Sequence, residues 1–352
     1  MEESIKTYKG FNKNMTCRGF QYEEGKEYEE ESVEVCNHGF HACEYPLDCL
    51  NYYSPNESVY HEVEQSGKIQ KHNEDTKVAS TKIKIGAEIS IAGLVKAAIE
   101  YLWQGNPDVW HGQSPILFPI VGTLLDNKCR IDGREYEMFR HGIARKRDFE
   151  LKEQGEDHLT LTQSWNNESL ERYPFKYIFD IEFKLDGKKL TVTHTIKNAD
   201  DKTMYFSIGA HPGFNCKIGD RLSFAEPETL VCEKIDTDSI LDGKHYPTLN
   251  NETDIVITKD IFDDDALILS GMKSDTVYLE SDKRPQKIKF NFGKAPVLGI
   301  WAKPGAEYVC IEPWYGINDS REVKEDFSQK RLIQKLEPGE EFVFPWSAEI
   351  IE

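Results

Sequence analysis

The chain has 352 residues, and 39% of them are hydrophobic, including 18 Phe, 16 Tyr and 6 Trp. This is enough for one large domain or two domains of ordinary size. The formal net charge of −19 argues against a nucleic-acid backbone or an anionic membrane as partner. No stretch approaches the ~20 apolar residues of a membrane-spanning helix, and no secretory signal is visible. We therefore expect a cytoplasmic protein whose eight cysteines are reduced.

Residues 1–79 are predicted to form a small α+β domain. A short helix is expected to begin near Pro46, and strands are expected at 60–63 and 78–91. Within the second strand, the run Lys82–Ile85 alternates polar and apolar residues, as a half-buried strand does.

Two cysteines and two histidines fall within eight residues of this domain, at Cys36, His38, His41 and Cys43. These residue types bind zinc, but the spacing C-x-H-x-x-H-x-C is not that of a common structural zinc site. The short intervals also hinder tetrahedral closure. Ordinary core and turn residues are the favoured interpretation, and no metal site is predicted here.

From residue 101 to residue 352 the sequence changes to many short strand-like runs at regular spacing. Runs at 158–164, 176–185 and 189–197 are examples, and turn pairs such as Asp186-Gly187 separate them. Few segments sustain a helical period. This pattern is typical of an all-β sandwich or barrel, so the chain is predicted to be mainly β.

Two of these strand-like runs end in a polar residue beside a proline. His211 precedes Pro212, and Glu312 precedes Pro313. A strand that stops at a turn places its last polar side chain at a sheet edge or a cleft mouth. A lone histidine of this kind is more often a turn residue, but a histidine and a carboxylate in matching positions indicate an acid–base pair.

The first part of the chain resembles an uncharacterised small domain of phage-related and bacterial proteins, over about residues 7–100. The matching stretches are YKGF (8–11), TCRGF (16–20), GFHAC (39–43) and the run from Lys77 to Ile89. This resemblance implies no known activity.

Residues 100–352 resemble the aldose 1-epimerase (galactose mutarotase) superfamily, and in particular its short bacterial members. The matching stretches stand in family order: EYLWQGNPDVW (100–110), SPILFPIVG (114–122), FRHGIAR (139–145), YPF (173–175), FSIGAHPGFN (206–215) and IEPWYGIND (311–319). The resemblance implies a large twisted β-sandwich with a sugar cleft across one sheet.

The resemblance also implies an activity, the interconversion of the α and β anomers of an aldohexose without a metal or cofactor. It makes His211 the acid and Glu312 the base of ring opening. The side chains that it places against the sugar are His141, Arg145, Asp265, Phe214, Trp301 and Trp314. For the three aromatic residues, core packing is the alternative interpretation.

Two departures from the family pattern bear on this interpretation. Many relatives carry a basic residue after the FPIVG run, where this chain has Thr123, so Arg145 is expected to be the only cationic side chain close to the site. The family's opening strands are also missing as such. Residues 80–100 are predicted to be a junction that supplies them, since the motif GAEISI stands at 86–91. The alternative is a fusion in which the small domain has replaced these strands and left a sheet edge exposed.

Three functions follow as alternatives. The favoured one is mutarotation of an unphosphorylated aldohexose, because a single arginine is thin support for a phosphate group. The others are mutarotation of a hexose 6-phosphate and non-catalytic carbohydrate binding. Sugar binding alone does not require an acid–base pair, which favours an enzyme. The expected partner in each case is a small sugar molecule.

Overall fold

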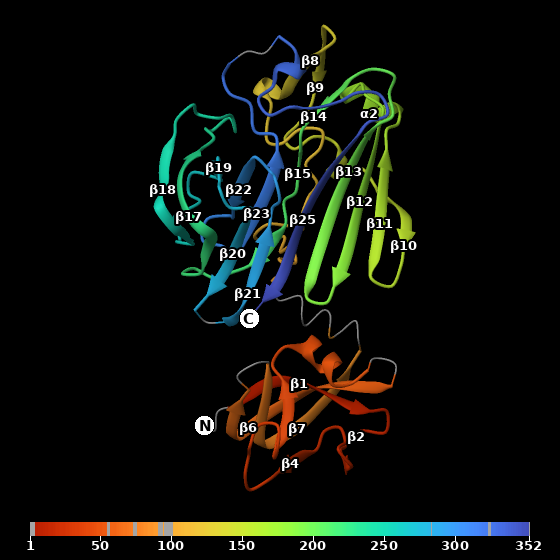
Figure 1. Cartoon of the computed structure of the whole chain (residues 1–352), viewed down its shortest axis with the longest axis vertical. Coiled ribbons are helices and arrows are strands. Elements are labelled where there is room, and N and C mark those ends of the chain that lie inside the picture. The colour runs from red at the N-terminus through yellow and green to blue at the C-terminus, as the bar shows by residue number, and fades with distance from the viewer. Residues whose placement is uncertain are drawn as a thin grey trace. The chain divides into compact units, whose positions relative to one another are not determined.

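A computed structural model of the chain describes residues 4–54, 57–72, 76–90, 94, 101–282, 284–322 and 325–351. The chain divides into two compact units, residues 1–100 and residues 101–352, which we call the small domain and the large domain (Figure 1). Both are built mainly from antiparallel strands, which confirms the predicted fold class.

The small domain is a short, strongly curved sheet. Its elements are β1 (Ile5–Asn12), β2 (Thr16–Cys17), β3 (Phe20–Gln21), β4 (Glu27–Glu29), β5 (Phe40–Cys43), the 3-10 helix η1 (Pro46–Asn51), β6 (Ser58–Lys71) and β7 (Lys77–Ile89). Strand β7 pairs with both β5 and β6, and β1 also pairs with both, so these four strands form a closed circuit. Strand β4 pairs with the part of β7 from Lys82 to Lys84. One side of this circuit packs around the rings of Phe11, Tyr22 and Phe40.

Strand β7 corrects the predicted junction at residues 80–100. Residues 80–89 lie in β7 and pair with β4, β5 and β6 of the small domain, so they supply no strand to the large sheet. The reason is the length of the β6–β7 hairpin, whose pairing runs from Lys71 opposite Val78 to Tyr60 opposite Ile89. Of residues 91–100, all except Leu94 lie outside the described residues.

The first half of the large domain supplies long, regular strands. It contains η3 (Leu125–Asn127), β8 (Lys128–Ile131), β9 (Arg134–Glu137), η4 (Ala144–Lys146), β10 (Glu150–Gln154), β11 (His158–Ser164), α2 (Asn167–Arg172), β12 (Tyr177–Asp186), β13 (Lys189–Asn198), β14 (Met204–Phe206), β15 (Ile208–Gly209) and β16 (Gly213–Asn215). In β13 every second residue from Val192 to Asn198 is buried, the period expected of a strand with one covered face. The strands predicted at 158–164, 176–185 and 189–197 are confirmed.

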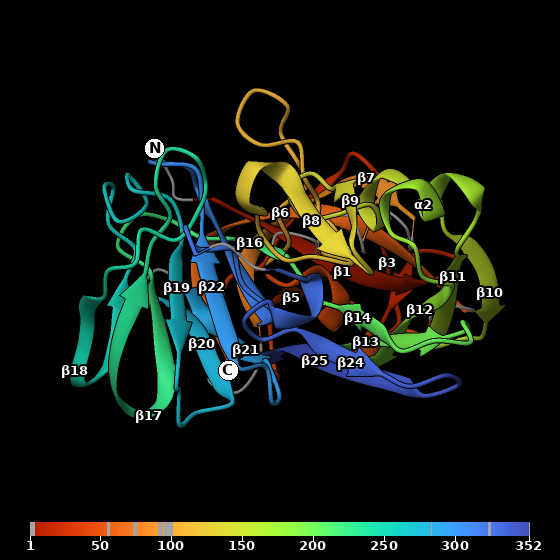
Figure 2. The same ribbon diagram turned by 90° about the horizontal axis from the view of Figure 1, so that it is seen from above.

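The second half supplies the strands that carry the candidate site. It contains β17 (Arg221–Glu233), β18 (Tyr246–Val256), β19 (Leu267–Ser270), β20 (Thr276–Ser281), β21 (Arg284–Asn291), β22 (Val297–Trp301), β23 (Tyr308–Tyr315), η5 (Phe327–Gln329), β24 (Gln334–Leu336) and β25 (Glu341–Ile351). A 14-stranded sheet has the main order β10-β11-β12-β13-β25-β21-β20-β17-β19-β22-β23-β15. Figures 1 and 2 show β10–β11 and β17–β18 at opposite sides of the domain.

Strand β23 is almost entirely buried and has an interrupted neighbour. Seven of its eight residues, Tyr308 to Trp314, are buried. On one side it pairs continuously with β22. On the other side it pairs with β15 and then with β16, and residues 210–212 lie between these two short strands. His211 is the middle residue of that interruption, opposite Glu312 in the register.

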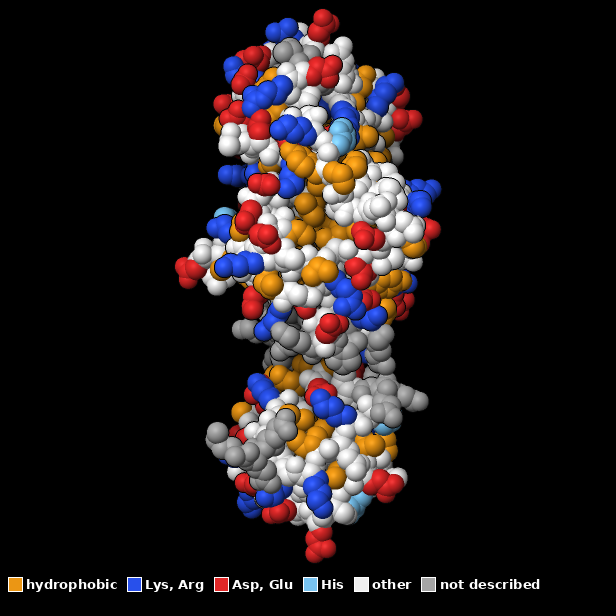
Figure 3. Space-filling view, turned by 90° about the vertical axis from the view of Figure 1, so that its left-hand side faces the viewer, with side chains coloured by type: hydrophobic (Ala, Val, Ile, Leu, Met, Phe, Trp, Pro, Cys, Tyr) orange, Lys and Arg blue, Asp and Glu red, His pale blue; other side chains and the backbone are white. Residues whose placement is uncertain are grey.

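The surface of the molecule mixes both signs of charge. On the face seen in Figure 3, acidic and basic side chains are interspersed over the large domain, with hydrophobic side chains gathered between them. Among the described residues, no helix is long and apolar enough to cross a membrane. All eight cysteines are described, and none forms a disulfide.

Candidate active site

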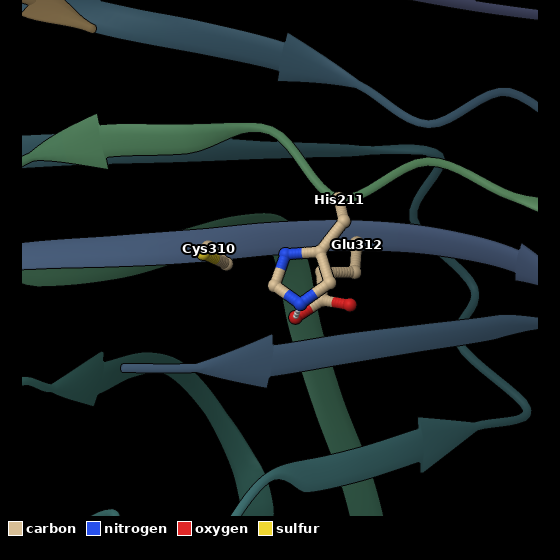
Figure 4. Close-up of side chains that lie close together, drawn as sticks. All are labelled: His211, Cys310 and Glu312. Atoms are coloured by element: carbon tan, nitrogen blue, oxygen red, sulfur yellow. Dashed lines mark ion pairs between the residues drawn. The ribbon is translucent and has the colours of Figure 1, made fainter. Parts of the chain in front are cut away.

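His211 and Glu312 form a buried pair at the interruption between β15 and β16. The Nε2 atom of His211 lies 3.2 Å from Oε1 of Glu312, and the two side chains are only 9% and 2% exposed. Figure 4 shows His211 reaching toward Glu312 on β23, with Cys310 on the same strand. The other carboxylate oxygen of Glu312 accepts a hydrogen bond from the indole Nε1 of Trp314, at 3.2 Å.

Burial disfavours charge on both members of this pair. It raises the pKa of Glu312 well above 4.5, and the positive charge of Arg140 only partly opposes this shift. Burial, with smaller contributions from the charges of Arg140 and Arg145, lowers the pKa of His211 to about 3. Both pKa shifts favour a pair that shares one titratable proton at neutral pH, because adding or removing a proton would leave a buried net charge.

An aromatic stack fixes the ring of His211. Trp110 stacks on His211 with ring centroids 5.1 Å apart and an interplanar angle of 27°. Tyr308 stacks on Trp110 in turn, and Trp103 stacks on Tyr308. The backbone N–H of Trp103 donates to Gly213 O at 2.9 Å, so the segment that carries both tryptophans is attached beside β16.

His141 approaches the pair from a tight turn. Its backbone φ of 64° is in the left-handed region, and the following residue, Gly142, has φ 71°. A Cβ at Gly142 would clash with the carbonyl oxygen of Phe118, so only glycine allows the turn to run this close to Phe118. The rings of His141 and His211 are 5.9 Å apart. Burial lowers the pKa of His141 well below 6.5, and His211 and Arg140 add to the shift.

These side chains line a cavity of about 690 Å³, a volume within the usual range for small-molecule sites. Seven of the eight residues predicted for the site line it: His141, Arg145, His211, Asp265, Trp301, Glu312 and Trp314. Asp265 has a backbone φ of 69° and accepts a hydrogen bond from the backbone N–H of Ala266. The three adjacent aspartates made this position uncertain from sequence, and Asp265 is the one of the three that lines the cavity.

Phe214 is the exception. It is 1% exposed, packs against Phe290 with ring centroids 5.6 Å apart and does not line the cavity. The core-packing alternative therefore holds for Phe214. Phe214 follows His211 by three positions, and alternation along an extended chain turns the two side chains to opposite faces.

The expectation that Arg145 is the only cationic side chain near the site is wrong. Arg140 and Lys146 also line the cavity. Arg140 has an Nη atom 3.8 Å from the carboxylate of Asp265, and the guanidinium of Arg145 donates to the carbonyl of Arg140 at 3.0 Å. The turn around His141 and the start of η4 bring these three basic residues to one wall, which no regular period in the sequence predicts.

Four of the lining residues to which sequence reasoning assigned no role are Trp110, Arg140, Lys146 and Asn318. Three of them stand inside the stretches that carry the family resemblance, and Lys146 follows one directly, so the signal was present without an assigned role. Asn318 donates from Nδ2 to the carbonyl of Ser239 at 2.9 Å, and its side chain occupies the space above Gly122.

One group of potential metal ligands lies inside this site. One ligand atom from each of His211, Cys310 and Glu312 lies within 4.8 Å of the others. We assign no metal to the group, because burial raises the pKa of the Cys310 thiol and so disfavours the thiolate that a metal would need.

The cysteines and histidines of the small domain have other partners. Nε2 of His41 accepts the backbone N–H of Cys36 at 2.9 Å, and His38 lies 3.2 Å from Glu30. Cys43 packs in an apolar cluster with Tyr8 and other residues. Among the described residues, these side chains do not form a group close enough to share a metal ion.

Comparison with known proteins assigns both parts of the chain. Residues 73–345 match the model of the aldose 1-epimerase family, and residues 5–97 match a domain of unknown function (DUF7666). The fold and the buried pair define a galactose mutarotase-like β-sandwich with a buried acid–base pair at its main sheet. The chain belongs to the aldose 1-epimerase family.

Three relatives illustrate the likeness. Protein LacX (plasmid) of Lactococcus lactis subsp. lactis is 32% identical over 259 residues, which are 69% of this chain and 87% of the relative. The structure of a galactose mutarotase related enzyme from Lactobacillus acidophilus is 32% identical with a TM-score of 0.67, and the match covers 72% of this chain and 87% of that one. A galactose mutarotase-like protein from Lactobacillus casei ATCC 334 is 25% identical with a TM-score of 0.69, over 76% and 93% of the two chains.

Proposed function

We propose that the large domain is an aldose 1-epimerase, which interconverts the α and β anomers of an aldohexose. The observation that carries the proposal is the buried His211–Glu312 pair, with Nε2 and Oε1 3.2 Å apart in a cavity large enough for a sugar. Such a pair provides an acid and a base in one site, which mutarotation requires and simple sugar binding does not.

The reaction follows from this pair. Glu312 removes the proton from the C1 hydroxyl while His211 protonates the ring oxygen, so that the bond from C1 to the ring oxygen breaks and an aldehyde forms. Rotation about C1–C2 presents the other face of the aldehyde. Ring closure then reverses both proton transfers, and the pair ends with the same single proton with which it began.

The surrounding side chains support these two steps. Trp314 donates to Glu312 and orients its carboxylate, and Trp110 stacks on His211 and orients its ring. We assign His141 and Asp265 to the binding of sugar hydroxyls, because both line the cavity. Trp301 lies edge-on to His211, with ring centroids 5.8 Å apart, and offers an apolar surface to the C–H groups of the sugar.

The three basic residues on one wall favour a second candidate substrate. Arg140, Arg145 and Lys146 could neutralise a phosphate group, and a guanidinium binds phosphate through two parallel hydrogen bonds. This observation favours a hexose 6-phosphate more than the sequence did. The alternative is that these basic residues have no part in substrate binding and only balance the negative charge of Asp265, whose carboxylate lies 3.8 Å from Arg140.

The test is the decay of optical rotation of freshly dissolved α-D-glucose, α-D-galactose and α-D-glucose 6-phosphate. We expect wild type to accelerate at least one decay, and His211→Asn and Glu312→Gln to lose about 10²–10⁴-fold in rate, the usual share of general acid–base catalysis. His158→Asn and Glu150→Gln, which alter side chains away from the cavity, are the matched controls.

Each outcome decides between the alternatives. Acceleration of the glucose 6-phosphate decay alone would identify the phosphorylated substrate. A folded wild type that accelerates none of the three decays would contradict an enzymatic function, and non-catalytic carbohydrate binding would remain as the alternative. Full activity in either site variant would contradict the assigned pair.

A further inference from the structure

The small domain has a cavity of its own, with a volume of about 520 Å³. Its walls come from the ends of β1 and β7, the β2–β3 hairpin, the segment from Cys36 to Cys43 and the end of η1. This volume lies within the range of small-molecule sites. The cavity is lined entirely by residues of the small domain, and no activity is known for the family that this domain matches.

Basic groups converge on this cavity although the chain as a whole is strongly acidic. Arg18, Lys77 and Lys9 all line it. The guanidinium of Arg18 donates to the carbonyl of Cys36 at 3.5 Å, and Nζ of Lys77 lies 3.8 Å from the thiol sulfur of the same residue. Two positive charges therefore meet at Cys36, which is exposed at the cavity wall.

Basic side chains outnumber acidic ones among the described residues that line the cavity. Among the described residues that line it, Glu30 is the one carboxylate, and it lies 3.2 Å from Nε2 of His38. Burial lowers the pKa of His41 to about 4, so this ring is neutral at pH 7. The formal charge of the lining is therefore positive in a protein whose net charge is −19. Such a local reversal of sign attracts anions.

Aromatic rings stand beside these charges. Nζ of Lys77 lies over the ring of Tyr52, 4.3 Å from its centroid. Tyr52 and Phe20 are 47% and 49% exposed, although both are large and apolar enough to be buried in a core. Half-exposed rings at the rim of a cavity provide stacking surfaces for a flat group of a ligand.

We propose that this cavity binds a small organic anion. A phosphate or carboxylate group lies between Arg18 and Lys77 beside Cys36, and the rest of the molecule contacts the rings of Tyr52 and Phe20. Arg18 suits an oxyanion because its fork of N–H donors matches two oxygens, and Lys77 adds a point charge. The proposal does not depend on the activity proposed for the large domain.

Isothermal titration calorimetry on the full chain tests the proposal with four probes: inorganic phosphate, ribose 5-phosphate, AMP and adenosine. We expect at least one of the three anions to bind, with an affinity that weakens as salt is added, and adenosine to bind no better than buffer alone. If AMP exceeds ribose 5-phosphate, the flat ring contributes; if the two are equal, the anionic group suffices. Absence of binding by all three anions would overturn the proposal.

Variants locate the bound anion. Arg18→Gln and Lys77→Ala should each weaken binding by roughly 10- to 100-fold, the cost of one charge-assisted hydrogen bond. Lys84→Ala removes an equal charge from the exposed part of the same strand β7 and should change nothing. Arg145→Gln tests whether the anion enters the large domain instead. Binding that is lost in Arg145→Gln but kept in Arg18→Gln would contradict the proposal.

Alkylation of Cys36 gives a readout that is local to the cavity. Iodoacetamide is uncharged, and the modified peptide is identified by mass spectrometry. A bound anion between Arg18 and Lys77 should slow modification of Cys36, while modification of Cys129 in the large domain is unaffected. A modification rate of Cys36 that stays the same at saturating probe would overturn the placement.

Discussion

The proton shared by His211 and Glu312 defines how the site should respond to pH. If Glu312 and His211 had ordinary pKa values, the carboxylate and the imidazolium would coexist only at a pH between those two pKa values. Activity would then fall once the pH exceeded about 6.5. Here the order is reversed, because burial raises the pKa of Glu312 well above 4.5 and lowers that of His211 to about 3. The form with one proton therefore extends to lower pH, down to about 3, and its basic limit is set by the raised pKa of Glu312.

This reversal predicts a broad plateau of kcat/KM. We expect an acid limb only near the lowered pKa of His211, where a second proton enters the pair, and a basic limb that reports the raised pKa of Glu312. Polarimetry across both limbs, corrected for the uncatalysed reaction in each buffer, measures the profile. Arg145→Gln removes a charge that lowers the pKa of His211 and should move the acid limb toward higher pH. An inflection of wild type at pH 6.5 would show that the histidine titrates as a solvated group.

Individual residues show where sequence reasoning about the site succeeded. His211 and Glu312 were recognisable because each ends an apolar run beside a proline. Glu312 and Trp314 are two residues apart on one strand and so share a face, which places both at the cavity. Arg140 and Lys146 lie in a turn where His141 adopts positive φ, and no periodicity applies to such a turn.

At the scale of elements, three strands hold the indole of Trp314 in place. Trp314 lies on β23, and its indole packs against Gly209 on β15 and Gly299 on β22. A Cβ on Gly299 would lie 2.5 Å from the indole carbon Cζ2, and one on Gly209 would lie 2.6 Å from Cδ1. Both strands therefore need glycine at these points, since the indole donates to Glu312 from the space between them.

This packing predicts that Gly299→Ala harms catalysis from outside the cavity. The added methyl group should displace the indole and with it the carboxylate of Glu312, which lowers kcat by roughly tenfold or more. The same overpacking should cost about 1–3 kcal/mol of stability. Polarimetry and thermal unfolding measure the two effects.

A second substitution checks the cause. Trp314→Phe leaves more room, so Gly299→Ala in that background should destabilise the protein less than it does alone. Activity should stay low in the double variant, because phenylalanine has no N–H for Glu312. Equal destabilisation in both backgrounds would show that the methyl group does not act through Trp314.

Regular elements were predictable and short ones were not. Strands β12 and β13 alternate buried and half-buried residues over six and seven positions, and the predicted bounds of β11, β12 and β13 agree with the structure to within about one residue. Strands β15 and β16 are two and three residues long, and they exist because β23 offers backbone partners on that side. Their interruption, which positions His211, is a tertiary feature that no local pattern records.

At the scale of the whole molecule, the division between the domains was the hardest feature to predict. The two family matches overlap over residues 73–97, and β7 lies inside the overlap. Its sequence suits both the last strand of the small domain and an opening strand of the large domain. Pairing decides the matter, because β7 is the strand shared by β4, β5 and β6.

Two truncations test this division. Removal of residues 1–90 takes away the small sheet as a whole, and we expect the remainder to be soluble and to retain the activity of the full chain. Removal of residues 1–75 leaves β7 without β5 and β6, so its buried face and both edges would be exposed, and we expect aggregation. Circular dichroism, size-exclusion chromatography and polarimetry compare the two. The opposite result would mean that residues 76–90 serve the large domain.

The tryptophans around the cavity give the protein a built-in optical reporter. Trp110, Trp301 and Trp314 line the cavity and Trp103 stacks beside them on Tyr308, so four of the six tryptophans of the chain lie at one place. Intrinsic emission should therefore come mostly from this region, and a sugar that displaces water from it should shift the spectrum. Occupancy of the site can be followed without a label, in the same cuvette and at the same time as the change in optical rotation.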